Sequence, residues 1–299
     1  MSFCSDIKSE IINKPLEENH LLPLLCGFAL QYKNDTKQII RIKSIQLSII
    51  KFINDIIFKL YNKKYPISND LKHKITKETV YSIDINQEDF NSTINQDLEK
   101  CKKFINSSMI RPFITGIFLS NGYINDPNSK KYMLYMKFKD EEVPNQIISK
   151  LSSYEDKRKI SFKIIKVKNH IEIYLKKSDQ IANFLAFINA HVSMLNFENI
   201  RLTKDFYNNT NRLAICDSVN FAKTLKTSQK NLSDIELLET KFSYLILDER
   251  LKKLIELRKE NPEASYGELA DLSTLQGFPI SKSTVAKLFV QLSNIVHKS

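Results

Sequence analysis

The sequence predicts an α+β protein in which an α/β region with antiparallel sheets is followed by an all-helical region at the C-terminal end. Apolar residues recur at helical spacing from Ser44 to Tyr61. Residues 107–190 alternate helical and strand patterns in the order α-β-β-α-β-β-α. After Arg201 every periodic segment has the helical spacing. These three observations place the sheets before the final helices.

The middle third gives the clearest order of elements. Helices are predicted at residues 107–121, 141–154 and 178–190, and Ser178 or Asp179 is expected to be the N-cap of the last one. Strands are predicted from Gly122 and at residues 131–139, 159–168 and 171–176, with turns at residues 125–128 and 169–170.

The first hundred residues look like a weaker copy of the same order. Helices are predicted at residues 18–32 and 44–61, and a strand at residues 78–86. We therefore expect an internal pseudo-repeat. The predicted domains are residues 1–105, residues 106–202, a helical linker at residues 203–245 and a C-terminal domain at residues 246–299.

The C-terminal domain is expected to hold three short helices, at residues 248–261, 265–275 and 281–297. Pro262 ends the first of them, since proline cannot continue a helix. Gly277 and Pro279 mark a tight turn between the second and the third. This spacing is that of a helix-turn-helix.

Composition excludes several classes of protein. No apolar run approaches the roughly 18 residues of a membrane span, and the first residues lack the basic and apolar parts of a secretion signal. Cys4, Cys26, Cys101 and Cys216 form no CxxC pair, and the five histidines show no HxxxH spacing. We therefore expect a cytoplasmic protein with no membrane contact, no metal site and no cofactor. The net charge of +11 favours an acidic partner.

The third C-terminal helix is the best candidate for contact with DNA. An apolar stripe of Val285, Leu288, Phe289, Leu292 and Ile295 should face the core. No carboxylate lies between Pro279 and Ser299. The predicted DNA-binding residues of the helix-turn-helix are Ser265, Ser281, Lys282, Ser283, Thr284, Lys287 and Gln291, with Ser281 as an N-cap. The alternative is a helical docking module with a lysine-bearing solvent face.

Two further sets of residues could contact DNA. Residues 157–177 carry eight basic side chains against Glu172, and such a sheet could follow phosphates with Lys159, Lys163, Lys166 and Lys168. The alternative is a solvated edge whose lysines prevent strand pairing. On the helix between the domains, a second set is expected to contact DNA or to fix the domain interface: Asn211, Arg212, Asn220 and Lys223.

The segment Ile114–Gly122, ITGIFLSNG, resembles the signature helix of LAGLIDADG homing endonucleases. A fainter copy is Leu25–Lys33, LCGFALQYK. The resemblance implies two helices in close contact through small residues, each ending in a metal-binding acid. Here Asn121 and Tyr32 occupy the acid positions, and neither a neutral amide nor a phenol replaces a carboxylate that holds a catalytic cation. We therefore expect no catalytic residues and no enzyme activity.

Nearly the whole chain resembles the WhiA family of sporulation and cell-division regulators, which joins a degenerate LAGLIDADG domain to a helix-turn-helix. The motifs that carry the resemblance are residues 111–138, 188–191, 197–201, 211–213, 216–217, 220, 223 and 280–283. The resemblance implies a DNA-binding transcriptional regulator with roles in cell division and chromosome segregation. It also implies promoter DNA as partner, RNA polymerase or another regulator as a further partner, and association with the nucleoid.

Two other functions remain open from the sequence. One is a scaffold that binds proteins of the transcription or division machinery. The other is a residual metal-dependent DNA endonuclease that uses other acids, such as Asp126 or Glu141.

Overall fold

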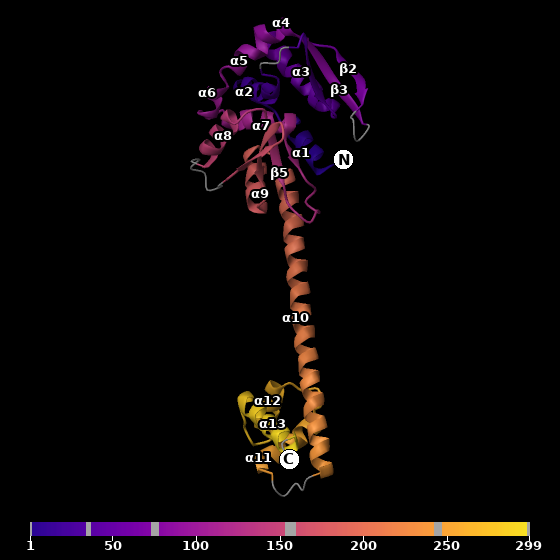
Figure 1. The fold of residues 1–299 in the computed structure, drawn as a ribbon. Helices are drawn as coiled ribbons and strands as arrows, with labels where there is room; N and C mark the ends of the chain where they lie inside the picture. Colours follow the sequence, from indigo (N-terminus) through magenta and orange to yellow (C-terminus); the bar gives the residue numbers. More distant parts are fainter. Residues whose placement is uncertain (1, 34–36, 73–77, 153–159, 242–246, 298–299) are drawn as a thin grey trace. The chain divides into compact units, whose positions relative to one another are not determined.

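The computed structural model describes residues 2–33, 37–72, 78–152, 160–241 and 247–297 (Figure 1). The chain forms two compact units, residues 1–204 and residues 205–299. The fold is α+β, and the sheets lie in the first unit and are antiparallel, as predicted. No helix among the described residues is long and apolar enough to cross a membrane.

The first half of the α/β unit contains two longer helices and a three-stranded sheet in the order β1-β3-β2. Its elements are α1 (Phe3–Ile12), α2 (Glu18–Ala29), β1 (Ile39–Ser44), α3 (Leu47–Tyr61), β2 (Ile67–Lys72), β3 (Thr79–Asn86), α4 (Gln87–Phe90), α5 (Gln96–Leu98) and α6 (Cys101–Ile105). The predicted strand at residues 78–86 and the helices at residues 18–32 and 44–61 are confirmed to within a few residues. Strands β1 and β2 were not predicted. Strand β1 alternates buried and exposed residues as a half-buried strand does, but it is short and adjoins the strong helical pattern of α3.

The second half follows the predicted order α-β-β-α-β-β-α closely. Its elements are α7 (Ile110–Asn121), β4 (Tyr123–Ile124), β5 (Leu134–Phe138), α8 (Glu142–Ser152), β6 (Lys163–Val167), β7 (His170–Leu175) and α9 (Ser178–Phe187). The four strands form a sheet in the order β4-β5-β7-β6. The described part of the first half has one strand fewer, so the pseudo-repeat is approximate.

The predicted N-cap of α9 is wrong. Lys177 is the N-cap residue, and no side chain caps this helix end. Because the helix begins at Ser178, Asp179 lies in its first turn and pairs with Arg201 instead. The following helix α10 (His191–Lys241) begins before the predicted helical linker at residues 203–245, since it starts inside the α/β unit and continues into the second unit.

The two halves of the α/β unit share one hydrophobic core, at whose centre α2 packs directly against α7. A Cβ atom added to Gly27 would lie 1.9 Å from the carbonyl oxygen of Phe113, and one added to Gly116 would lie 2.0 Å from that of Leu24. Each glycine therefore lets the backbone of the opposite helix approach closely. The contact is reciprocal, as expected for two related helices.

Helix α10 is anchored to the first helix of the chain through one carboxylate. The Glu10 oxygens accept hydrogen bonds from the backbone nitrogens of Val192 and Ser193, at 3.0 and 2.8 Å, and from the Ser193 hydroxyl at 2.7 Å. Lys14 adds an ion pair at 3.0 Å. Partial burial raises the pKa of Glu10, but the hydrogen bonds from Ser193, Val192 and Lys14 outweigh burial and lower the pKa below its ordinary value.

The second unit packs the end of α10 against α11 (Glu249–Glu260), α12 (Tyr266–Leu275) and α13 (Lys282–His297). These three helices match the predicted ones closely. Their shared core consists of leucine, isoleucine, valine and phenylalanine side chains from all four helices. Asn231 and Asp234 of α10 are buried and bond the trio, Asn231 to the Tyr266 hydroxyl at 3.0 Å and Asp234 to His297 at 2.8 Å.

We expect Gly116→Ala to destabilise the α/β unit by about 3 kcal/mol, because the new methyl group forces α2 and α7 apart. Urea unfolding, with hydrogen–deuterium exchange of α2 and α7 peptides, measures the loss in this unit. Asn145→Ala changes an exposed residue in the interior of α8 and is the control, with an effect within about 0.5 kcal/mol. Equal stability of the two variants would show that the glycine contact does not hold the helices together.

We expect Glu10→Gln to cost about 1–2 kcal/mol, since an amide cannot accept all the bonds that the carboxylate accepts. The lowered pKa gives stability that is present above about pH 4.5, the ordinary value, and is lost as pH falls through the folded-state value. The variant should therefore lose less stability than the wild type on acidification.

Hydrogen exchange of amides at the start of α10, followed as a function of pH, measures the stability of this contact, with Glu99→Gln at an exposed position as control. Parallel acid titration curves for wild type and Glu10→Gln would contradict it.

Candidate nucleic-acid interface

Helix α13 presents one polar face to solvent and buries the other. Val285, Leu288, Phe289 and Leu292 are buried as predicted, Val296 is buried as well, and Ile295 packs partly buried against the same core. The side chains exposed on the opposite face include four of the predicted DNA-binding residues: Lys282, Ser283, Lys287 and Gln291. Ser283, Lys287 and Gln291 are spaced four apart and so form one row along the helix.

The start of α13 is capped by Ser281, as predicted. The Ser281 hydroxyl accepts a hydrogen bond from the backbone nitrogen of Thr284 at 3.2 Å. It also lies 2.8 Å from the Ser283 hydroxyl and 2.9 Å from the Thr284 hydroxyl. Three neighbouring hydroxyl groups therefore gather at the end of the helix where a helix dipole favours a negative charge.

The turn before α13 is fixed by one glycine and one buried hydroxyl. Gly277 has a φ of +80°, a conformation that L side chains rarely adopt, and a Cβ added there would meet nothing within 4 Å. The buried Ser273 hydroxyl donates to the carbonyl of Ala270 at 2.7 Å and accepts from the nitrogen of Ile280 at 3.2 Å. These bonds set the direction in which α13 leaves the turn.

The buried guanidinium of Arg258 joins α11 to both helices of the helix-turn-helix. Its Nη1 donates to the carbonyl of Ala264 at 2.6 Å, just before α12 begins. Its Cζ lies 5.9 Å from the ring of Tyr266 and 5.5 Å from the ring of Phe289, and those rings stack 5.5 Å apart. Burial lowers the pKa of Arg258 from its ordinary value. Sequence reasoning missed this residue, which looks like any other basic residue of α11.

Ser265, a further predicted DNA-binding residue, lies at the start of α12 and not on α13. It is the N-cap of α12, where its hydroxyl accepts from the Glu268 nitrogen at 3.3 Å and its own nitrogen donates to the Glu268 carboxylate at 2.6 Å. Hydrogen bonding of the Glu268 carboxylate by the Ser265 backbone nitrogen, and by the Ser265 side chain, lowers the pKa of Glu268. The hydroxyl of Ser265 is therefore occupied by the helix cap, beside a carboxylate.

The lysines of β6 do not share one face of the sheet. Successive strand residues point to opposite sides, so Lys163 projects from one face while Lys166 belongs to the other. All three described lysines, Lys163, Lys166 and Lys168, are exposed, and Lys159 lies outside the described residues. Ile164, the apolar neighbour of Lys163, is 41% exposed because β6 is the edge strand. Lys163 and Lys166 therefore do not lie on one face of the strand, and contact of this sheet with phosphates stays a prediction.

The solvent face of this sheet carries a row of side chains that sequence reasoning missed. The register pairs Tyr123 with Tyr135, Tyr135 with Tyr174, and Tyr174 with Lys163. Lys137 lies 5.4 Å from the Tyr135 ring and Lys176 lies 5.0 Å from the Tyr174 ring. The alternation of these residues with buried ones was visible in each strand, but the order of the strands was needed to join them into a row.

Asn121 and Tyr32, at the positions of the former catalytic acids, make backbone contacts. The Asn121 side chain accepts from the nitrogen of Lys137 at 3.1 Å and donates to its carbonyl at 2.9 Å, which ties α7 to β5. The Tyr32 hydroxyl accepts from the nitrogen of Lys43 at 3.4 Å. Asp126, an alternative acid, accepts from the nitrogen of Asn128 at 2.7 Å. Among the described residues no group of three or more His, Cys, Asp or Glu side chains could hold a metal ion.

The residues predicted on the connecting helix all lie on α10 within the second unit and are exposed: Asn211, Arg212, Asn220 and Lys223. Lys223 lines a small hollow together with Lys282 of α13, and Thr224 and Ser265 lie beside them. Asn220 lines a different, acidic groove. The structure thus places Lys223 close to the candidate DNA-contacting helix and Asn220 away from it.

An α/β unit of two related halves followed by a C-terminal helix-turn-helix defines a class of protein that joins a LAGLIDADG-like domain to a helix-turn-helix domain. Comparisons with known proteins find the same two domains. Residues 110–207 match the WhiA LAGLIDADG-like domain and residues 210–296 match the WhiA C-terminal HTH domain, together more than half of the chain. The chain belongs to the WhiA family.

Relatives and a solved structure extend the match to the whole chain. The "Probable cell division protein WhiA" of Carboxydothermus hydrogenoformans is 37% identical over 63% of this chain and 58% of its own length. The protein of the same name from Enterococcus faecalis is 26% identical over 100% of this chain and 98% of its own length. The crystal structure of full-length DUF199/WhiA from Thermatoga maritima shares the fold, with a TM-score of 0.57 and 20% identity, over 100% of this chain and 98% of that one.

We expect Arg258→Leu to destabilise the second unit by about 3 kcal/mol, because the partly buried carbonyl of Ala264 loses its donor and the two rings lose the cation. Arg258→Lys should recover only part of the loss, since an ammonium cannot stack as a planar guanidinium does. Hydrogen exchange of peptides from α11 to α13 measures both variants. The control is Arg250→Lys, at an exposed position of the same helix. An Arg258→Leu variant as stable as this control would contradict the assigned role.

Proposed function

We propose that this chain is a DNA-binding transcriptional regulator that contacts duplex DNA through α13. One observation carries the proposal: Ser283, Lys287 and Gln291 form an exposed row beside Lys282, and no carboxylate lies between Asp271 and Ser299 to oppose the lysines. An α-helix with such a face fits the major groove of B-DNA. The turn fixed by Gly277 and Ser273 sets the direction of α13, and the apolar face of the helix packs on the core while this row stays exposed.

Each residue type on this face suits a separate part of the duplex. Lys282 and the hydroxyls of Ser281, Ser283 and Thr284 lie at the first turn, where phosphate contacts are favoured by the charge and by the helix end. Lys287 and Gln291 lie farther along the same face and can reach base edges, lysine toward guanine and glutamine toward adenine.

We propose further that the α/β unit does not cleave DNA. Hydrolysis of a phosphodiester with metal ions needs carboxylates at the ends of the two central helices, and Asn121 and Tyr32 are neutral there. Their side chains instead bond the backbones of neighbouring strands. Incubation of the purified chain with supercoiled plasmid and Mg²⁺ should leave the plasmid intact. Nicking that disappears on Asp126→Asn or Glu141→Gln would support the nuclease alternative.

The biological role rests on the relatives. Because proteins of this family are named probable cell division proteins, we propose that the regulated genes serve cell division and chromosome segregation. The chain would then act in the cytoplasm at promoters on the nucleoid, alongside RNA polymerase or another regulator. Genome-wide mapping of bound DNA tests the promoter targets directly, and random distribution of the bound sites would contradict a regulator.

We expect the double variant Lys282→Gln with Lys287→Gln to bind duplex DNA more weakly and with a flatter dependence on salt. Each lost phosphate contact lowers the slope of log K against log [salt] by about one. Fluorescence anisotropy with a labelled duplex at several salt concentrations gives both quantities.

The matched control is Lys252→Gln with Lys259→Gln. These lysines lie on α11 of the same unit, but each already pairs with a carboxylate, Lys252 with Glu249 and Lys259 with Glu239. The control should leave the salt slope unchanged. If the α13 variant and the α11 variant behave alike, α13 is not the helix that contacts DNA.

A further inference from the structure

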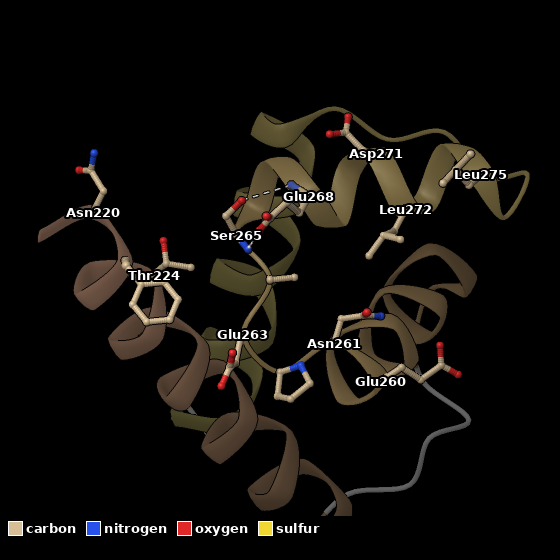
Figure 2. Close-up of a pocket in the computed structure, with 13 residues that line it drawn as sticks. Asn220, Thr224, Glu260, Asn261, Glu263, Ser265, Glu268, Asp271, Leu272 and Leu275 are labelled. Carbon is tan, nitrogen blue, oxygen red and sulfur yellow. Dashed lines mark hydrogen bonds between the residues drawn. The ribbon is translucent and has the colours of Figure 1, made fainter. Parts of the chain in front are cut away.

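A groove of about 940 Å³ lies in the second unit between α10 and α12, and none of Ser283, Lys287 and Gln291 of α13 is among its lining residues (Figure 2). Its floor is the connection between α11 and α12, which includes Asn261 and Glu263. Asn220 and Thr224 of α10 stand on one wall, and Asp271, Leu272 and Leu275 of α12 stand on the other.

All the charged side chains that line the groove are acidic. Four exposed carboxylates line it: Glu260, Glu263, Glu268 and Asp271. No lysine or arginine is among the lining residues. Lys223 and Lys282 line the neighbouring hollow. The surface therefore changes from basic to acidic within a few residues of α10 and α12, and a DNA phosphate would be repelled from the acidic side.

The groove is also apolar at its two walls. Phe221 of α10 is 55% exposed and Leu275 of α12 is 83% exposed, although both are large apolar side chains. Leu272 and Pro262 extend this apolar surface between them. Single exposed apolar residues are ordinary, but a contiguous patch edged by charges of one sign is typical of a binding surface.

We propose that this groove docks a basic amphipathic helix of another protein. Leucine-sized side chains of such a helix would pack on Phe221, Leu272 and Leu275, and its lysines or arginines would pair with the surrounding carboxylates. The charge of the groove is complementary to that helix and not to DNA or to an acidic peptide. A second copy of this chain fits less well, since each copy carries a net charge of +11. The proposal extends beyond DNA binding and does not depend on it.

The test uses the full chain and two labelled helical peptides of about 18 residues. One peptide has leucine on one face and lysine on the other, and the second has glutamate in place of each lysine. Fluorescence anisotropy should show saturable binding of the lysine peptide and at least about tenfold weaker binding of the glutamate peptide. The double variant Phe221→Ser with Leu275→Ser should weaken binding of the lysine peptide by about tenfold.

Val290→Ser is the matched control, because Val290 is 61% exposed but lies on α13. It should leave peptide binding unchanged, and all these positions are exposed, so the fold should persist. Absence of binding up to about 1 mM, equal binding of both peptides, or equal losses in the groove and control variants would each overturn the proposal. The proposal would also be overturned by a wild-type dimer in sedimentation equilibrium that the groove variant abolishes, since a second copy would then fill the groove.

The two proposals can fail independently. DNA binding of the groove variant should remain intact, and peptide binding should survive the change of Lys282 and Lys287.

Discussion

The α/β unit depends on the contact between two helix backbones at Gly27 and Gly116. A methyl group at either position would lie within about 2 Å of a carbonyl oxygen of the opposite helix, so no other residue allows the same approach. The two halves of the unit meet along this line and share one core. The contact also brings the C-terminal ends of α2 and α7 to the sheets, where a nuclease would need its acids. This chain keeps the packing and has Asn121 at one of those ends, bonded to a strand.

The two sides of the helix-turn-helix have opposite charges, and this separation links the two proposals. Helix α13 presents lysine, serine and glutamine, and α12 presents glutamate and aspartate beside exposed apolar groups. Arg258 lies between them with its charge buried, bonded to the backbone just before α12 and stacked on rings from α12 and α13. A regulator that holds DNA on one side and a protein on the other needs such a division of charge.

Periodicity in the sequence was sufficient for the order of elements in residues 107–190, for the three C-terminal helices and for the buried stripe of α13. Periodicity was insufficient for short strands and for sites whose residues lie far apart in the sequence. Strand β1 was overlooked beside the strong pattern of α3, and the lysines of β6 were grouped together although their odd spacing places Lys163 and Lys166 on opposite faces. Three features join residues that are far apart in the sequence, so only the fold reveals them. They are the row of Tyr123, Tyr135 and Tyr174, the contacts of the buried Arg258, and the acidic groove.

The most direct test of DNA contact by α13 is cleavage of bound duplex DNA by an iron chelate tethered to Gln291→Cys. The background is Cys216→Ser, because Cys4, Cys26 and Cys101 are buried and Cys216 is exposed. We expect cleavage confined to a few neighbouring base pairs at each bound site, and no localised cleavage when the chelate is tethered to Leu275→Cys in the groove. Localised cleavage from the groove, with none from α13, would contradict it.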